Sequence, residues 1–425
     1  MITAAAPPLD AAEAARRAGQ GRLPVWLVSP TDGDLEIDRQ IVACDPVRVV
    51  RGDLEELEQA WAQARADWRG GPGVPVAVGF FSYDLGRRFE RLRGPARRSE
   101  WPDLEFRFYD ALWVRRPDRA EIWAQDDAAA ARLGARLAAP APPTELGEVL
   151  GPLEDLDPPA GYLAGVERIL EYLRAGDVYQ VNLARRLSAP VPAGEGPEGW
   201  ALFARLQAES PAPHALWLGD HQSCLVGNSP ERFLRLDEHG RLETRPIKGT
   251  RPRGADAAEL ARHPKDLAEH IMIVDLERND LGRVCQVGSV EVHGFARTLS
   301  LPTVHHLVTT VSGQLRTEVS LGQLLRATFP GGSITGAPKI RAMEIIAELE
   351  SAARGPYTGA TGWLGAAGDL DLAVAIRTGL VRDGRLTLWV GGGIVVDSIP
   401  DEELRETVAK ASAFARLSAR PRKGQ

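Results

Sequence analysis

Two ionisable residues near the middle of the chain have the types and spacing of an acid–base pair. Lys248 lies in the Pro- and Gly-punctuated stretch RPIKGTRPRG, and Glu231 lies upstream in NSPERF. The turn DEHG at 237–240 separates two alternating segments, which predicts a β-hairpin that brings Glu231 and Lys248 together. Such a pair is either structural or a proton-transfer couple, and Lys248 alone is a nucleophile, a phosphate clamp or a solvated charge.

Glu269 lies on a predicted helix over about 264–281. It shares a helical face with Met272, Ile273 and Leu276, and a carboxylate on an apolar face needs a partner because an isolated buried charge is costly. The pattern fits either a border residue paired with a nearby arginine, or a carboxylate that serves as a metal ligand or an acid.

A second helical stretch, PDEELRETVAKA at 400–411, carries Glu403 and Glu406 on one face, with Lys410 one turn after Glu406. Acidic residues suit the first turn of a helix, and a Glu–Lys pair at this spacing is a routine surface pair. The alternative is a carboxylate cluster for a hard cation such as Mg²⁺, which takes one or two carboxylates and keeps waters or substrate oxygens.

Two glycine-rich stretches and a histidine pair complete the candidate residues. In PGGSITGAPK at 330–339, Ala337 stands at the position where a P-loop has its phosphate-binding lysine. The stretch is therefore either a plain turn into a helix or an anion site at the helix N-terminus. The glycines 391–393 predict a turn ahead of a strand, with room for a ligand to approach the backbone. In TVHHLV, His305 and His306 point to opposite faces of a predicted strand, so at most one faces a given site.

The elements that must position these residues fall into two segments. An Ala- and Pro-rich stretch over about 137–158 is predicted as a linker between a strand-rich N-terminal segment, 1–145, and a longer segment, 158–421. The second segment combines amphipathic helices with runs of antiparallel strands and lacks regular βαβ alternation. This order predicts an α+β fold and not a doubly wound parallel sheet.

The composition excludes several classes of protein. The 425 residues are 44% hydrophobic and 26% charged, which suffices for a large core, and the net charge of -7 argues against a general nucleic-acid binder. The three cysteines are widely spaced, which argues against a disulfide framework and favours the reducing cytoplasm. No apolar run reaches the ~18 residues of a membrane helix, and the N-terminus lacks the apolar core of a signal peptide.

Taken in order, several stretches resemble the chorismate-utilising enzymes, a family that includes anthranilate, aminodeoxychorismate, isochorismate and salicylate synthases. They span nearly all of 160–412 and include GDVYQVNLARRL, SPERF, RPIKGTRPRG, AEHIMIVDLERNDLGRV, FPGGSITGAPKIRAMEII and GGGIVVDSIPDEELRETVAKA. The resemblance implies an anthranilate synthase component I-like fold, with large, mainly antiparallel sheets packed together and helices on the outer faces. Trp363 departs from an expected tyrosine, and WLVS at 26–29, within segment 1–145, only loosely resembles the L-L-E-S of relatives that bind tryptophan in their N-terminal domain.

The resemblance also implies roles for individual residues. The lysine form of the PIKGT motif is similar to the aminodeoxychorismate synthases, in which this lysine, here Lys248, attacks C2 of chorismate while the C4 hydroxyl leaves; ammonia then enters at C4 and expels the lysine. Glu231 is the implied general acid and base, and Glu269 and Glu406 are the implied Mg²⁺ ligands, with Glu403 acting through water. The implied substrate-binding residues are Gly249, Thr250, His306, Tyr357, Arg377, Gly391, Gly392, Gly393 and Lys410.

The implied product is 4-amino-4-deoxychorismate, on the route to para-aminobenzoate and folate. None of Cys44, Cys224 and Cys285 lies in a Gly-flanked nucleophile turn, so we expect a separate glutamine amidotransferase subunit to supply the ammonia. Two alternatives remain open: an anthranilate synthase, which also eliminates pyruvate, and a catalytically silent chorismate-binding regulator. Isochorismate and salicylate synthases fit less well because they activate water.

Overall fold

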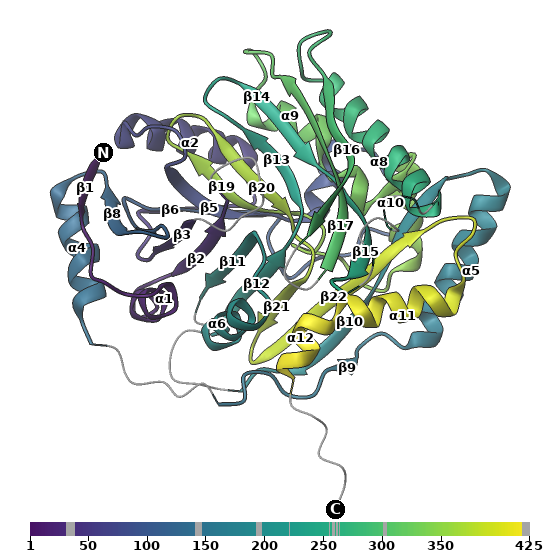
Figure 1. Cartoon of the computed structure of the whole chain (residues 1–425), viewed down its shortest axis with the longest axis horizontal. Helices are drawn as coiled ribbons and strands as arrows, with labels where there is room; N and C mark the ends of the chain where they lie inside the picture. The colour runs from purple at the N-terminus through teal and green to yellow at the C-terminus, as the bar shows by residue number, and fades with distance from the viewer. Residues whose placement is uncertain are drawn as a thin grey trace, which may run out of the picture.

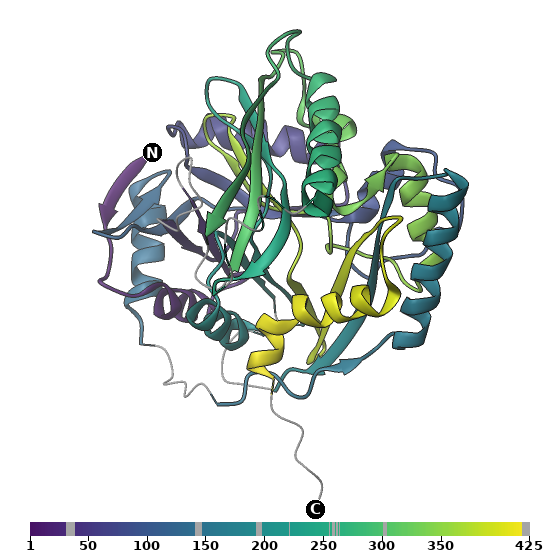
Figure 2. The same cartoon turned by 45° about the vertical axis from the view of Figure 1, so that its right-hand side comes forward.

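The computed structural model describes residues 1–30, 39–140, 147–192, 198–220, 222–254, 256, 260, 262, 264–300 and 304–418, without the side chains of 250–252, 265 and 304. Within these residues most strands join two large antiparallel sheets (Figures 1 and 2). In spatial order, the first sheet contains β1 (Ile2–Ala5), β8 (Ala120–Ala124), β7 (Ala111–Arg115), β3 (Arg39–Ala43), β2 (Val25–Ser29), β11 (His214–Gly219), β12 (Ser223–Ser229), β21 (Thr378–Arg382), β22 (Arg385–Ile394), β10 (Gln180–Pro190) and β18 (Gly336–Ala337), and β9 (Glu154–Asp155) pairs with β10.

The second sheet carries the predicted hairpin. Its strands β13 (Arg232–Leu236) and β14 (Arg241–Arg245) pair directly, which confirms the hairpin across 237–240. In spatial order it contains β15 (Ile247–Pro252), β17 (Val304–Gln314), β14 (Arg241–Arg245), β13 (Arg232–Leu236), β20 (Leu370–Val374), β19 (Ala360–Gly365), β5 (Pro75–Phe81), β6 (Leu104–Phe108) and β4 (Arg48–Arg51), and β16 (Glu291–Ser300) also pairs with β17.

Helices pack against both sheets, as the α+β prediction requires. In Figure 1, α11 (Pro400–Lys410) crosses in front of β22, and α8 (Pro264–Gly282) lies beside β16 and β17. The predicted helix over 264–281 is α8, which confirms that assignment. The helices are α1 (Ala11–Ala18), α2 (Leu54–Trp68), α3 (Gly86–Phe89), α4 (Asp127–Ala138), α5 (Pro159–Ala175), α6 (Trp200–Glu209), α8 (Pro264–Gly282), α9 (Leu321–Thr328), α10 (Lys339–Leu349), α11 (Pro400–Lys410) and α12 (Ser412–Leu417), with short 3₁₀ turns η1 (Tyr83–Leu85) and η2 (Gly332–Ile334).

Alternation along the strands divides the hydrophobic core into two clusters. Val25 and Leu27 of β2 belong to the cluster that contains apolar residues of both sheets. Trp26 and Val28 point to the other face and pack in a second cluster with helices α1, α4, α6 and α12; the Trp26 ring lies edge-on to Phe203 of α6 at 5.0 Å. One face of the first sheet therefore meets the second sheet, and the other is covered by helices.

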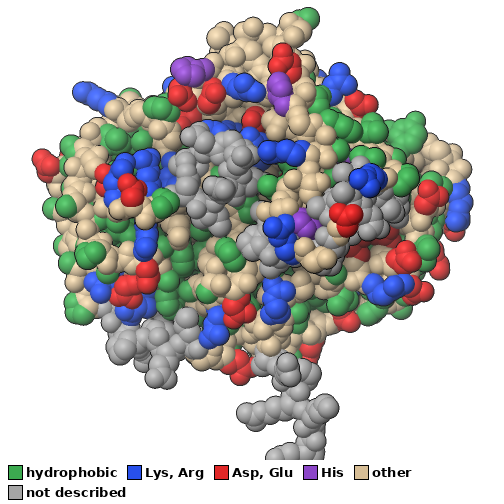
Figure 3. All heavy atoms as spheres, viewed as in Figure 1, with side chains coloured by type: hydrophobic (Ala, Val, Ile, Leu, Met, Phe, Trp, Pro, Cys, Tyr) green, Lys and Arg blue, Asp and Glu red, His purple; other side chains and the backbone are tan. Residues whose placement is uncertain are grey.

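The two segments on either side of 146–157 share both sheets. In the first sheet β2 of the N-terminal segment pairs with β11, and in the second sheet β5 pairs with β19. The outer surface carries charges of both signs, interspersed on the face shown in Figure 3. Among the described residues, no helix is both long enough and apolar enough to cross a membrane.

The prediction of a turn at 391–393 is wrong. These glycines lie inside β22 and pair in register with Ala184, Leu183 and Asn182 of β10. The sequence cue misled because a glycine run favours turns in isolation, whereas here the glycines continue a ladder and leave the space beside it to side chains from elsewhere.

A buried arginine connects the elements around these glycines. Arg354 is 2% exposed and donates to both carboxylate oxygens of Glu350, at 2.9 and 2.6 Å. A guanidinium has five N–H donors, and burial makes any unused donor costly, so the surrounding residues must supply the remaining acceptors. These acceptors are Asn182 O of β10 at 2.8 Å, Ile334 O of η2 at 3.2 Å and Thr358 Oγ1 at 3.1 Å.

We expect Arg354→Met to lower the free energy of unfolding by about 3–5 kcal/mol, because it leaves the Glu350 carboxylate buried without its cation. Chemical denaturation followed by circular dichroism measures this change. Arg382→Met is the matched control, since Arg382 forms an exposed pair with Glu100 at 3.6 Å and should cost less than ~1 kcal/mol. Equal losses in the two variants would contradict the proposed importance of the buried pair.

Candidate active site

Glu231 and Lys248 lie near each other at the end of the hairpin. Glu231 directly precedes β13, whose first residue pairs with the last residue of β14, and Lys248 is the second residue of β15. The Ile247 N–H lies 3.5 Å from Glu231 Oε1. Burial raises the pKa of the Glu231 carboxyl, and the charge of Lys248 opposes that shift. The hairpin prediction therefore placed the pair correctly.

The amine of Lys248 is enclosed and is not a solvated surface charge. Its side chain is 12% exposed, and Nζ lies 3.3 Å from Glu269 Oε1. Nζ also donates to Ser333 O at 3.1 Å, in the glycine-rich turn η2. The partner of Glu269 is therefore this lysine, and not the arginine that one interpretation of the helix pattern expected.

Gly249 lets the strand bend beside the lysine. It adopts a φ of 60°, and the register between β15 and β17 shifts between Lys248 and Thr250. A Cβ at Gly249 would lie 2.8 Å from Leu260 Cδ1, so no other residue fits without displacement. The Thr250 backbone pairs with His306, while the Thr250 side chain lies outside the described residues.

His306 and His305 face different neighbours, as the strand alternation predicts. His306 Nδ1 lies 3.3 Å from Gly249 O, whereas His305 contacts the Ser300 hydroxyl at 2.8 Å. Burial lowers the pKa of His306 to about 4, with a further contribution from the charge of Arg377. A neutral imidazole therefore faces the bulge at Gly249 at neutral pH.

Arg377 supplies a positive charge on the Glu231 side of this site. Burial lowers the pKa of its guanidinium, and the Glu231 carboxylate opposes the shift. In the part of the chain that the structure describes, this guanidinium has no hydrogen bond or ion pair, and the residue adopts a positive φ of 50°. An arginine held in this way is suited to bind a carboxylate ligand.

The glycines of β22 are bordered by an aromatic stack and by α11. Tyr357 stacks on Trp389, two residues before the glycines, with ring centroids 5.6 Å apart and an interplanar angle of 9°. Lys410 Nζ donates to Gly391 O at 2.8 Å and pairs with Glu406 Oε1 at 2.6 Å. The implied substrate-binding residues Tyr357, Gly391 and Lys410 thus meet at one strand.

Carboxylates approach the neighbouring glycines from two helices. A Cβ at Gly392 would lie 3.3–3.4 Å from the nearest carboxylate oxygens of Glu403 and Glu406 on α11. A Cβ at Gly393 would overlap the amide of Gln180 and lie 3.0 Å from Glu269 Oε1 on α8. The absence of side chains at 392 and 393 leaves room for these acids, which lie against two successive residues of β22.

The acids that border β22 suit a hard cation that needs only one or two ligands from the protein. Across the described residues, no three His, Cys, Asp or Glu side chains surround one metal position. Magnesium typically takes one or two carboxylates, however, and Glu269 and Glu406 offer that number. Gln180 donates to Glu269 at 3.3 Å, and its buried Oε1 finds no hydrogen-bond partner among the described residues, so an acceptor remains for a water or ligand.

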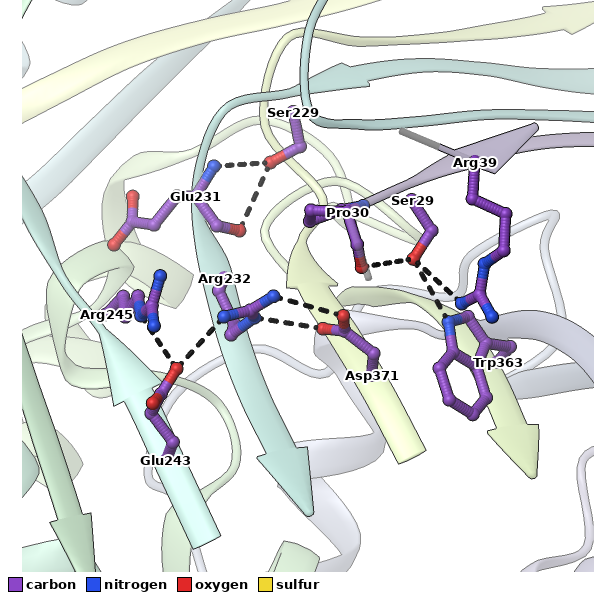
Figure 4. A network of polar contacts seen from close by, with 10 residues as sticks. All are labelled: Ser29, Pro30, Arg39, Ser229, Glu231, Arg232, Glu243, Arg245, Trp363 and Asp371. Carbon is purple, nitrogen blue, oxygen red and sulfur yellow. Dashed lines mark hydrogen bonds and ion pairs between the residues drawn. The ribbon is translucent and has the colours of Figure 1, made fainter. Parts of the chain in front are cut away.

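A buried ionic network lies behind Glu231 and was not predicted from the sequence. Figure 4 shows the Arg232 guanidinium directed at Asp371 and Glu243. Arg232 bonds both oxygens of Asp371, at 3.1 and 3.2 Å, and lies 2.9 Å from Glu243 Oε1. The network fixes the strand directly after Glu231. Charged residues on three neighbouring strands gave the only signal, and their partners could not be assigned without the sheet order.

Trp363, which departs from the family pattern, lies in β19 and is visible on the right of Figure 4. Its indole N–H donates to Ser29 Oγ of the WLVS stretch at 3.4 Å, and the Arg39 guanidinium lies over its ring at 5.4 Å. Trp363 thus joins β19 of the second sheet to β2 of the first.

The family assignment follows from comparison with known proteins. The model of the chorismate binding enzyme family matches residues 31–416. The chain therefore belongs to this family. It is 40% identical to the aminodeoxychorismate synthase component 1 of Klebsiella aerogenes, over 87% of this chain and 82% of the relative. It is 39% identical to the protein of the same name from Escherichia coli, over 79% of this chain and 75% of the relative.

A solved structure supports the same architecture. The anthranilate synthase component I of Streptococcus pneumoniae is 29% identical, superposes with a TM-score of 0.78, and covers 91% of this chain and 94% of its own. This likeness confirms the expected anthranilate synthase component I-like fold.

We expect Gly393→Ala to weaken chorismate binding by about 5-fold. The new Cβ displaces Gln180 and breaks its hydrogen bond to Glu269, and a lost hydrogen bond corresponds to about 1 kcal/mol. Titration calorimetry with chorismate and Mg²⁺ measures the change. Gly161→Ala in α5 is the control, because its Cβ would meet no atom within 4 Å. An unchanged dissociation constant for Gly393→Ala would refute the assignment of this strand to the binding site.

Proposed function

We propose that this chain converts chorismate and ammonia to 4-amino-4-deoxychorismate and water, with a separate glutamine amidotransferase component as the ammonia source. The observation that carries the proposal is the enclosed amine of Lys248, which shares one site with Glu231 and Glu269. The relatives named aminodeoxychorismate synthase component 1, which match most of the chain, support it.

The proposed reaction has two substitutions at the ring. The Lys248 amine forms a bond to C2 of chorismate, the two ring double bonds shift from C1–C2 and C5–C6 to C1–C6 and C4–C5, and the bond between C4 and its hydroxyl breaks. Ammonia then forms a bond to C4, and the lysine leaves from C2. A covalent lysine intermediate divides one difficult displacement into two easier ones, but only a neutral amine can attack.

Glu231 is the proposed proton carrier for both steps. Hydroxide is a poor leaving group, so the departing C4 oxygen needs a proton, and the incoming ammonia must later lose one. Burial raises the pKa of Glu231, which favours the protonated acid that the first step requires. The same carboxylate can then accept the proton from the nitrogen, which returns the site to its starting state.

The remaining residues orient the substrate. The buried Arg377 guanidinium is suited to form a forked pair with a substrate carboxylate, and the Tyr357 ring lies stacked on Trp389 of β22. His306 is neutral at neutral pH and can donate or accept a hydrogen bond without adding charge. Glu269 and Glu406 would hold Mg²⁺, with Glu403 acting through water. The bound ion would neutralise the ring carboxylate.

The cysteines support a separate source of ammonia. Hydrolysis of glutamine by an amidotransferase uses a thiolate nucleophile, which needs a depressed pKa and access to substrate. Cys44, Cys224 and Cys285 are all buried, and burial raises the pKa of each thiol, to about 11 for Cys285. The word "component" in the names of the relatives fits a partner protein with this role.

Anthranilate synthase is the second candidate, and a specific similarity favours it. The anthranilate synthase component 1 of Aquifex aeolicus is 43% identical over 59% of this chain. That enzyme class would release pyruvate in addition to aminating the ring. Pyruvate is therefore the product that separates the two candidates.

We expect wild-type protein, given chorismate, Mg²⁺ and ammonium, to form 4-amino-4-deoxychorismate without pyruvate. Lys248→Ala should reduce this rate more than about 100-fold because the nucleophile is absent. Lys248→Arg is the matched variant: it keeps a cation beside Glu269, but a guanidinium does not lose its proton. Chromatography of the products with mass detection reads both outcomes. Full activity in Lys248→Arg would show that only the charge matters.

Glu269→Gln and Glu406→Gln should each weaken Mg²⁺ binding at least ~10-fold, since even the outer-shell partners of metals have effects of that size. Calorimetric titration of Mg²⁺ into the chorismate complex measures binding without any turnover. Glu402→Gln is the control, because Glu402 is an exposed acid on the same helix. Retained affinity in both test variants would exclude these residues as ligands.

A further inference from the structure

Two buried acids on α8 have no role in the mechanism above. Glu277 is 3% exposed and Asp280 is 2% exposed, on the same helix as Glu269. Lys339 Nζ pairs with Asp280 Oδ2 at 2.6 Å and also donates to Thr328 O at 3.1 Å. Glu277 instead accepts the backbone N–H of Gly332 at 3.2 Å. Asp280 is thus paired with a cation, whereas Glu277 accepts a hydrogen bond from the backbone of a turn.

The turn that Glu277 binds contacts both proposed catalytic residues. Gly332 begins η2, and the next residue, Ser333, accepts Lys248 Nζ through its carbonyl oxygen at 3.1 Å. The Ser333 hydroxyl is among the groups that lower the pKa of Glu231. A Cβ at Gly332 would overlap the side chain of Leu276, so the turn lies directly against α8.

We propose that Glu277 is a positioning residue of this site: by accepting the Gly332 N–H it holds η2 against α8, so that Ser333 meets Lys248 and Glu231 together. The inference takes the chemistry of the site from the proposed function, but its geometry stands independently. Without an acceptor at 277 the buried Gly332 N–H would be unsatisfied, and the turn would gain freedom to move away from α8.

The charge state of Glu277 gives this contact a pH dependence. Burial, reinforced by the charge of Asp280, raises the pKa of Glu277 to about 8, while Lys339 lowers it and Glu231 raises it. These are the charged groups that face Glu277 from α8, from α10 and from the residue before β13. At neutral pH Glu277 is therefore protonated. Above about pH 8 it ionises, and its negative charge is added to that of Asp280 in the neighbourhood of Glu231.

The raised pKa of Glu277 makes the stability of the folded chain depend on pH. The unfolded chain loses the Glu277 proton near the ordinary value of 4.5, and the folded chain loses it near 8. Stability therefore declines as pH rises from about 4.5 to about 8, because the unfolded state binds fewer protons in that interval. Glu277→Gln has no proton to lose and should remove this part of the decline.

The test compares Glu277→Met, which lacks an acceptor, with Glu277→Gln, which keeps the equivalent oxygen. We expect kcat for chorismate consumption at pH 7 to fall at least ~10-fold in Glu277→Met and to stay within about 3-fold of wild type in Glu277→Gln. The Gln variant should also retain more activity than wild type above pH 8. Asp275→Ala is the control, because Asp275 is exposed on α8 and forms a surface pair with Arg278 at 2.8 Å.

Assays are run at a temperature where circular dichroism shows every variant folded, so loss of fold does not affect the comparison. Equal kcat in the Met and Gln variants, whether both high or both low, would overturn the proposal. An unchanged alkaline limb in Glu277→Gln would overturn its pH dependence. Chorismate consumption is counted whatever the product, so an unexpected product from wild type would refute the proposed function without touching the Met–Gln comparison.

Discussion

The buried charge of Arg354 constrains the rest of the site. A guanidinium in the interior is tolerated only when a carboxylate neutralises it and its N–H groups find acceptors, and Glu350 meets only the first need completely. The other acceptors come from β10, from η2 and from Thr358 beside Tyr357. Segments far apart in the sequence are thereby held in one geometry, and each of them borders the amine of Lys248, the glycines of β22 or the aromatic stack.

Around the buried Arg354, some elements of the site contribute functional side chains, whereas β22 contributes the space left by its glycines. The helix α8 supplies Glu269 to Lys248 and Glu277 to the turn η2. The helix α11 supplies acids that fit only because β22 has glycines opposite them. The strand carries no functional side chain at 391–393, and its contribution is space together with a carbonyl for Lys410.

Local patterns predicted the parts of the site that depend on neighbours in sequence. The hairpin that joins Glu231 to Lys248 and the helix that carries Glu269 both followed from periodicity and turn residues. The glycines 391–393 were assigned to a turn because a run of glycines looks the same whether it bends the chain or makes room for other residues. Ser333, Arg354 and Gln180 act through contacts between distant elements, which no local pattern records. Glu277 could have been singled out from the sequence, because it shares the face of α8 that carries Glu269.

The sharing of both sheets by the two segments has a consequence for how the chain folds. The strand β2 can pair with β11 only after β11 has been synthesised, and β5 can likewise pair only later with β19. The strands β5 (Pro75–Phe81) and β19 (Ala360–Gly365) are nearly three hundred residues apart in the sequence. Contacts of such long sequence separation form slowly, since the intervening chain must first be ordered. During synthesis the N-terminal strands therefore emerge with unpaired edges, a state in which chains are prone to aggregate and to depend on chaperones until the last third is complete.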